Sequence, residues 1–149
     1  MQIIVTENQS IATFNNVTAC YERSFIAEVL TQSAAAGINI DMIAQSPATS
    51  DKISFGFTFA DDDMTKLLAI SKSVVPDTAP LVNCGNVKLT VKSPDMVSGT
   101  GFASKVFIAL KQVDCVPMLV TTGIDEISLL IHKSCINALD ETLREIFDL

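Results

Sequence analysis

The sequence predicts an α+β fold of two ferredoxin-like (βαββαβ) domains in tandem, each an antiparallel sheet with its helices on one face. Short stretches in which apolar and polar residues alternate, typical of half-buried strands, are interspersed with stretches of helical spacing. The order of these stretches repeats, so that Lys52-Ile53-Ser54 in the first copy corresponds to Glu126-Ile127-Ser128 in the second. A β-α-β-β-α unit with right-handed crossovers closes as such a two-layer sandwich.

The first copy is expected to consist of strands at 11–17, 38–46, 53–59 and 81–84, with helices at 25–36 and 64–75. A polar loop, Thr18 to Ser24, precedes the first helix, and Gly37 is placed as the residue that stops it. The stripe of this helix that faces the core is predicted to be Ile26, Val29, Leu30 and Ala34.

Three consecutive acids, Asp61 to Asp63, precede the second helix of the first copy. Consecutive carboxylates point in different directions around a helix start, so an N-cap and a favourable dipole interaction are preferred over a metal site. The proline-containing stretch Pro76 to Pro80 ends that helix.

The second copy is predicted to contain strands at 87–91, 116–121 and 126–132 and helices at 102–113 and 136–147. It has no fourth strand of its own, whereas the leading stretch Gln2 to Val5 is unassigned. We infer that this stretch completes the second sheet. The first domain, 11–84, is then inserted in the second, which comprises 1–10 plus 85–149.

Composition limits the classes of function. The chain has 149 residues, 48% hydrophobic and 18% charged, which is the composition of a globular protein. No apolar run approaches the ~20 residues that span a bilayer, and the N-terminus lacks a secretory signal, so we expect a cytoplasmic protein without a membrane partner. The net charge of −7 disfavours nucleic acid, although RNA-recognition domains share this strand order.

The sequence contains few candidate residues for catalysis or for binding a metal or cofactor. The lone His132 has no partner set for catalysis, the four scattered cysteines are interpreted as reduced thiols, and no metal or cofactor is expected. The loop that begins at Gly99 lacks the third glycine of a dinucleotide fingerprint.

A binding argument remains. The start of the first helix suits a carboxylate, while Asp41 suits an ammonium group and the Asn39 amide both donates and accepts hydrogen bonds. These features favour a free amino acid as ligand. Asn39 and Asp41 are equally consistent with the solvent face of a half-exposed strand.

Several strings also resemble a known family: Gly37-Ile38-Asn39-Ile40-Asp41-Met42-Ile43-Ala44-Gln45-Ser46, Ile53-Ser54-Phe55, Val120-Thr121-Thr122 and Ile127-Ser128-Leu129-Leu130-Ile131. They are similar to the tandem ACT domains at the carboxyl end of aspartokinases, and the resemblance covers nearly the whole chain. It implies a non-catalytic, amino-acid-sensing regulatory module that forms a homodimer, with lysine or threonine as effector and an aspartokinase catalytic domain as a partner. The residues that it implies as effector contacts are Asn39, Ile40, Asp41, Gln45, Ala19, Ser24 and Phe25, with Thr121 and Thr122 as lining.

The chain departs from the family pattern in three places. Tyr21 to Ser24 stands where the family usually has Asp-x-Pro-Gly. In the second copy, Ser98-Gly99-Thr100-Gly101 stands where Ser-His-Pro-Gly is usual and keeps the glycine, and Val116-Pro117 replaces the Asn-Ile pair. We therefore expect at most one full effector site per chain, in the first copy. A structural dimerisation module whose pocket has decayed, and a free-standing ACT protein that regulates another enzyme, remain alternatives.

Overall fold

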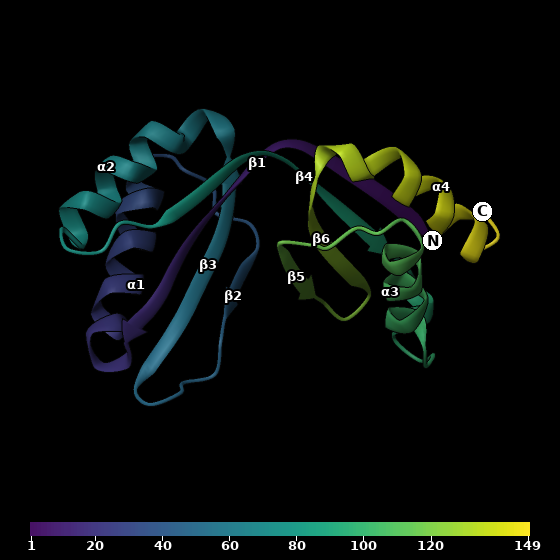
Figure 1. Ribbon diagram of the computed structural model, residues 1–149, viewed down its shortest axis with the longest axis horizontal. Coiled ribbons are helices and arrows are strands. Elements are labelled where there is room, and N and C mark those ends of the chain that lie inside the picture. The colour runs from purple at the N-terminus through teal and green to yellow at the C-terminus, as the bar shows by residue number, and fades with distance from the viewer. The chain divides into compact units, whose positions relative to one another are not determined.

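The computed structural model describes residues 1–149, apart from the side chains of residues 19–24. The chain divides into two compact units. We call Asn8–Cys84 the inner unit, and Met1–Glu7 together with Gly85–Leu149 the outer unit. Two long strands, β1 (Gln2–Thr18) and β4 (Leu81–Lys92), contribute residues to both units (Figure 1).

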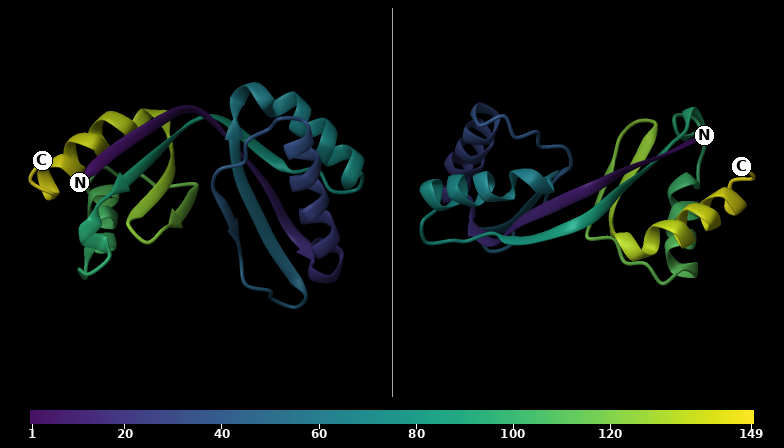
Figure 2. Two further views of the ribbon diagram at one scale, coloured as in Figure 1. Left: turned by 180° about the vertical axis from the view of Figure 1, so that it is seen from behind. Right: turned by 90° about the horizontal axis from the view of Figure 1, so that it is seen from above.

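The inner unit adds two helices and two strands to its parts of β1 and β4. In chain order these are α1 (Ala19–Ala35), β2 (Ile43–Gln45), β3 (Lys52–Ala60), the short 3₁₀ helix η1 (Asp61–Asp63) and α2 (Met64–Val74). The strand order is β2-β3-β1-β4, and β3 pairs antiparallel with both β1 and β2. Both helices lie on one side of these strands (Figure 2).

The outer unit has the same plan, with the strand order β1-β4-β6-β5. Its elements are η2 (Pro94–Met96), α3 (Phe102–Gln112), β5 (Leu119–Thr122), β6 (Glu126–His132), η3 (Lys133–Cys135) and α4 (Ile136–Ile146). β6 pairs antiparallel with β4 and with β5. The predicted α+β class, with antiparallel strands and helices on one face, is confirmed.

Each unit has its own core. Phenylalanines dominate the inner core, where Phe14, Phe57 and Phe59 are fully buried. The outer core is aliphatic and is built from Leu89, Leu129, Leu139 and their neighbours. Burying one such side chain contributes about 1.5–3 kcal/mol, so these two clusters supply most of the driving force for folding.

The first strand is longer than the sequence predicts. Gln2 to Val5 and 11–17 were predicted as separate stretches, yet β1 is continuous over its 17 residues and includes the polar residues 6–10. Gln9 and Ser10 are buried, and the Ser10 hydroxyl donates a 2.6 Å hydrogen bond to the Asp61 carboxylate. A buried polar group is tolerated when it is hydrogen-bonded, which a hydropathy pattern does not reveal.

Each of the two long strands has a residue with positive φ where the units divide. Asn8 has φ of 57° and Gly85 has φ of 72°, both in the left-handed region. Glycine and asparagine are the residues that adopt this region at least cost.

The helices of the inner unit confirm one prediction and correct two. Gly37, with φ of 75°, follows α1, and Ile38 donates its N–H to the Ser33 carbonyl as in a Schellman motif. The predicted stripe is wrong at Ala34, which is exposed while Ser33 is buried. The acids 61–63 form η1, and no side chain caps α2 through a hydrogen bond; Asp63 instead pairs with Lys66 at 3.0 Å.

No helix in the described chain is both long enough and apolar enough to cross a bilayer.

Candidate functional site

The segment after Gly37 presents the predicted polar residues at an edge of the inner sheet. Asn39, Asp41 and Gln45 are exposed and Ile40 is half-buried, while Ile38 and Met42 between them are 5% and 3% exposed. The predicted alternation is therefore confirmed, although the regular strand β2 begins only at Ile43.

A β-bulge explains why the strand is shorter than the predicted 38–46. Asp41 N–H donates to the Thr58 carbonyl at 3.1 Å, and Thr58 N–H donates to the Met42 carbonyl at 2.9 Å. Two residues thus oppose one. The second N–H, that of Met42, is satisfied by the buried Thr58 hydroxyl at 3.0 Å. The main chain that carries the Asp41 carboxylate is consequently fixed by three hydrogen bonds.

The predicted polar loop before the first helix is wrong, because α1 begins at Ala19 directly after β1 ends. The sequence between Thr18 and Phe25 contains neither proline nor glycine, so nothing in it stops the helix from extending back to the strand. Thr18 is the N-cap, and its side chain makes no capping hydrogen bond. The first N–H groups of α1 are therefore not capped by Thr18.

The remaining predicted contacts are placed as follows. The side chains of Ala19 and Ser24 lie outside the described part of the structure. Phe25 is 3% exposed and packs edge-to-face on Phe14, with ring centroids 4.7 Å apart. Thr121 and Thr122 lie on β5 of the outer unit, opposite Ser128 and Ile127. Among the predicted effector contacts, the polar side chains that the structure describes in the inner unit are therefore Asn39, Asp41 and Gln45.

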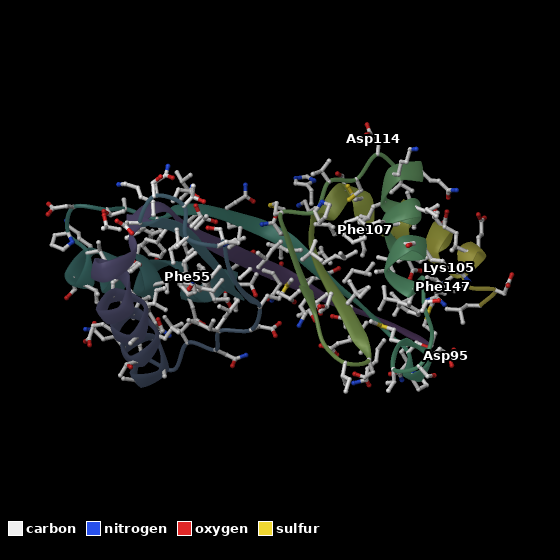
Figure 3. The ribbon with its side chains drawn as sticks, turned by 90° about the horizontal axis from the view of Figure 1, so that it is seen from below. Phe55, Asp95, Lys105, Phe107, Asp114 and Phe147 are labelled. Carbon is white, nitrogen blue, oxygen red and sulfur yellow. The ribbon has the colours of Figure 1, made fainter. Side chains whose placement is uncertain are left out.

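The outer unit contains a pocket that the sequence analysis did not identify. It has a volume of about 370 Å³ and lies where the loop 93–101 enters α3, beside the C-terminal end of α4. Asp95, Lys105 and Phe147 line it, together with the main chain from Gly99 to Gly101. Figure 3 shows these three side chains at the same end of the unit. The signal available in the sequence was the glycine pair followed by a lysine one turn later.

Features typical of catalysis are not assembled among the described side chains. No group of three or more potential metal ligands occurs among them. Burial, followed by the neighbouring Cys135, raises the pKa of the Cys115 thiol to about 12, so it stays protonated and is a poor nucleophile. His132 is exposed, and its Nδ1 lies 2.8 Å from the Ser134 hydroxyl.

The chain is similar to known proteins both in sequence and in structure. No family model matches the chain. In sequence it is 28% identical over 131 residues to the aspartokinase of Geobacillus stearothermophilus, an alignment that covers 83% of this chain and 30% of that protein. The chain therefore spans about a third of the length of the curated relatives it matches, whose matched shares are 30% and 31%.

In structure the chain is similar to the ligand-free regulatory subunit of aspartate kinase from Thermus thermophilus, with a TM-score of 0.86 and 17% identity over 99% of this chain and 97% of that one. It is also similar to E. coli aspartokinase III in complex with lysine and aspartate, with a TM-score of 0.72 and 19% identity over 97% of this chain and 32% of that one. The resemblance to the regulatory region of aspartokinases is confirmed.

Proposed function

We propose that this chain, which has the fold of an aspartokinase regulatory subunit, is a non-catalytic regulatory module that binds a free amino acid. One observation carries the proposal. The chain matches a separate regulatory subunit almost from end to end, over 99% of its own length and 97% of that subunit. We assign the inner and outer units to two ACT domains, the first inserted in the second, with boundaries at 8–84 and at 1–7 plus 85–149.

The effector is proposed to bind at the exposed edge of the inner unit. The Asp41 carboxylate would take an ammonium group, and the amides of Asn39 and Gln45 would each donate and accept hydrogen bonds. The first turn of α1 would offer N–H groups and a positive dipole end to the effector carboxylate. Lysine and threonine are the effectors we propose, and lysine is one of the two amino acids in the E. coli aspartokinase III complex.

Regulation would follow from a shift of population. An effector that binds one arrangement of subunits more tightly than another shifts the equilibrium toward it by its differential affinity. We propose that the module acts as a homodimer in the cytoplasm and controls an aspartokinase catalytic domain, in the same chain or in a separate one.

A dimerisation module without an effector is the second candidate. It is favoured by the extension of α1 to Ala19, which leaves no loop at which the main chain approaches a ligand. This candidate predicts a dimer in sedimentation that no amino acid changes.

Isothermal titration of the purified chain with lysine, with threonine and then with the other amino acids tests the proposal. Replacing Asp41 by Asn is expected to weaken binding roughly tenfold or more, because a charge-assisted hydrogen bond is lost. Asp51→Asn is the matched control. Asp51 is an exposed acid of the same unit with φ of 60°, a conformation that asparagine adopts readily.

Heat of binding that Asp41→Asn abolishes and Asp51→Asn preserves would support the site. Silence from all twenty amino acids at millimolar concentration would overturn the regulatory proposal and leave the dimerisation module.

A further inference from the structure

Two cysteine side chains of the outer unit lie together at its core. Cys115 is 5% exposed and belongs to the aliphatic cluster, and Cys135 is half-buried and packs against the same cluster. The Cys135 side chain lies within hydrogen-bonding reach of the Cys115 thiol. The two residues come from different segments, since Cys115 follows α3 and Cys135 is the N-cap of α4.

The main chain fixes Cys115 at the end of α3. Asp114, with φ of 51°, is the left-handed residue at which the helix stops. Asp114 N–H donates to the Lys111 carbonyl at 3.3 Å, and Cys115 N–H donates to the Leu110 carbonyl at 2.9 Å. These two hydrogen bonds form a Schellman motif, in which the residue after the left-handed one commonly packs back against the last turn of the helix. The Cys115 side chain is therefore directed to the core.

A short turn fixes Cys135 at the start of α4. Ser134 N–H donates to Nδ1 of His132 at 3.3 Å, and the Ser134 hydroxyl lies 2.8 Å from the same nitrogen. Cys135 is the last residue of η3. Neither cysteine lies in a strand or inside an α-helix, so a bond between the two sulfurs would break no ladder or helix hydrogen bond.

The two thiols differ in their access to reagents. Burial, followed by the neighbouring Cys135, raises the pKa of the Cys115 thiol to about 12, so this thiol stays protonated and shielded. Cys135 keeps part of its surface exposed, so a small oxidant reaches it first. An accessible cysteine beside a second, resolving thiol is the arrangement from which a disulfide forms after oxidation.

We propose that Cys115 and Cys135 are a redox pair, reduced in the resting protein and joined by an intramolecular disulfide when the chain reacts with a peroxide. The Cys135 sulfur attacks one oxygen of hydrogen peroxide, the O–O bond breaks, and the other oxygen leaves as water with the thiol proton. The Cys115 sulfur then displaces the hydroxyl of the Cys135 sulfenic acid, which leaves as a second water with the Cys115 proton. Two thiols and one peroxide thus give one disulfide and two waters.

The disulfide ties the end of α3 to the start of α4, two helices that pack together in the outer unit. A cross-link stabilises a protein mainly by constraining its unfolded chain, so oxidation is expected to raise the unfolding temperature. Neither cysteine belongs to the inner unit. The proposal therefore does not depend on the effector site at Asp41.

Peptide mapping of the full chain, treated with a small molar excess of hydrogen peroxide and then with iodoacetamide in denaturant, tests the proposal. Trypsin cleaves after Lys133 and so separates Cys115, in peptide 112–133, from Cys135, in peptide 134–144. The expected product is these two peptides joined, lighter than their sum by two hydrogen atoms, and dithiothreitol should separate them. The same oxidation is expected to raise Tm by roughly 5 °C or more.

Two variants and a control accompany the mapping. Cys135→Ser is expected to abolish both the linked peptide and the rise in Tm. Cys115→Ala is expected to do the same while it keeps a small apolar side chain in the core. Cys84→Ser is the matched control, because Cys84 is an exposed cysteine of the inner unit, and it is expected to preserve both effects.

A linked peptide and a raised Tm in the original chain and in Cys84→Ser, but not in Cys135→Ser, would support the redox pair. Recovery of Cys115 and Cys135 as alkylated thiols would overturn it, and so would a Cys135 sulfinic or sulfonic acid without a link. A linked peptide that leaves Tm unchanged or lowered would also overturn it, because the bond would then form only in a distorted chain.

Discussion

The two units share one strand order and differ in how their first strand reaches its helix. In the inner unit β1 runs directly into α1, without an intervening loop. In the outer unit residues 93–101 separate β4 from α3, and they contain η2, two glycines and the lining of a pocket. One topology therefore supports two kinds of helix start. The presence of glycine and proline in the connection decides which kind forms.

The cores differ as well. Phenylalanine rings pack together in the inner unit. The Phe57 centroid lies 5.5 Å from that of Phe55 and 6.2 Å from that of Phe59, both on β3, and 6.4 Å from that of Phe14 on β1. The outer unit has aliphatic residues at the corresponding places on β6. The inner core depends on a few large side chains and the outer core on many smaller ones.

The largest effect is expected when a buried core side chain is replaced by alanine. Phe57→Ala is expected to lower the free energy of unfolding by ~3–5 kcal/mol, because it removes a fully buried ring and leaves a cavity. Leu129→Ala in the outer unit, also fully buried, is expected to cost ~2–5 kcal/mol and less than Phe57→Ala. Urea unfolding followed by circular dichroism measures both.

Ile124→Ala is the control for both core substitutions. Ile124 is 78% exposed, and its loss is expected to stay within about 0.5 kcal/mol. A smaller loss for Phe57→Ala than for Leu129→Ala would contradict the view that a few rings dominate the inner core.

The next largest effect is expected at the bulge that carries Asp41. Thr58→Val keeps the shape of a fully buried side chain but removes the hydroxyl that accepts the Met42 N–H at 3.0 Å. A loss of ~1–3 kcal/mol is expected, because that N–H is left without its partner. If Asp41 binds an effector, calorimetry should also show weaker binding, since the bulge fixes the main chain of Asp41.

Thr90→Val is the comparison in the outer unit, where the Thr90 and Ser128 hydroxyls lie 2.9 Å apart in the core. It should destabilise the chain without changing an affinity that depends on Asp41. Equal effects of the two substitutions on effector binding would argue against a role for the bulge.

How much of this could be predicted from the sequence depends on the kind of signal. The alternation of apolar and polar residues predicted β3 and β6 nearly to their bounds, because a period of two residues is unambiguous when one face of a strand is apolar. It failed for residues 6–10, where the buried Ser10 is satisfied by a hydrogen bond to Asp61, which is distant in sequence. It also failed for the start of α1, where no helix breaker stops the helix from extending back to β1.

The candidate sites were predictable to a smaller extent. The exposure of Asn39 and Asp41 follows from the same alternation, and it was predicted. The pocket of the outer unit was not, because Asp95, Lys105 and Phe147 lie on three segments that only the tertiary fold brings together. The spacing along the chain offers only the glycine pair and the lysine one turn later, and it does not indicate that Asp95 and Phe147 lie beside them.

The smallest effect compares the second helix of each unit. Lys66 pairs with Asp63 at 3.0 Å beside α2, and Arg144 pairs with Asp140 at 2.8 Å on α4. Such exposed pairs contribute ~0.2–1 kcal/mol at most, so Lys66→Ala is expected to lower stability by no more than that. The effect should shrink further in high salt, because ions screen exposed charges over about 10 Å at 0.1 M. Arg144→Ala should behave in the same way. A larger loss of unfolding free energy in Lys66→Ala, one that salt does not reduce, would show that η1 and α2 depend on this pair. The start of α2 would then be stabilised by a charge contact in place of the missing cap.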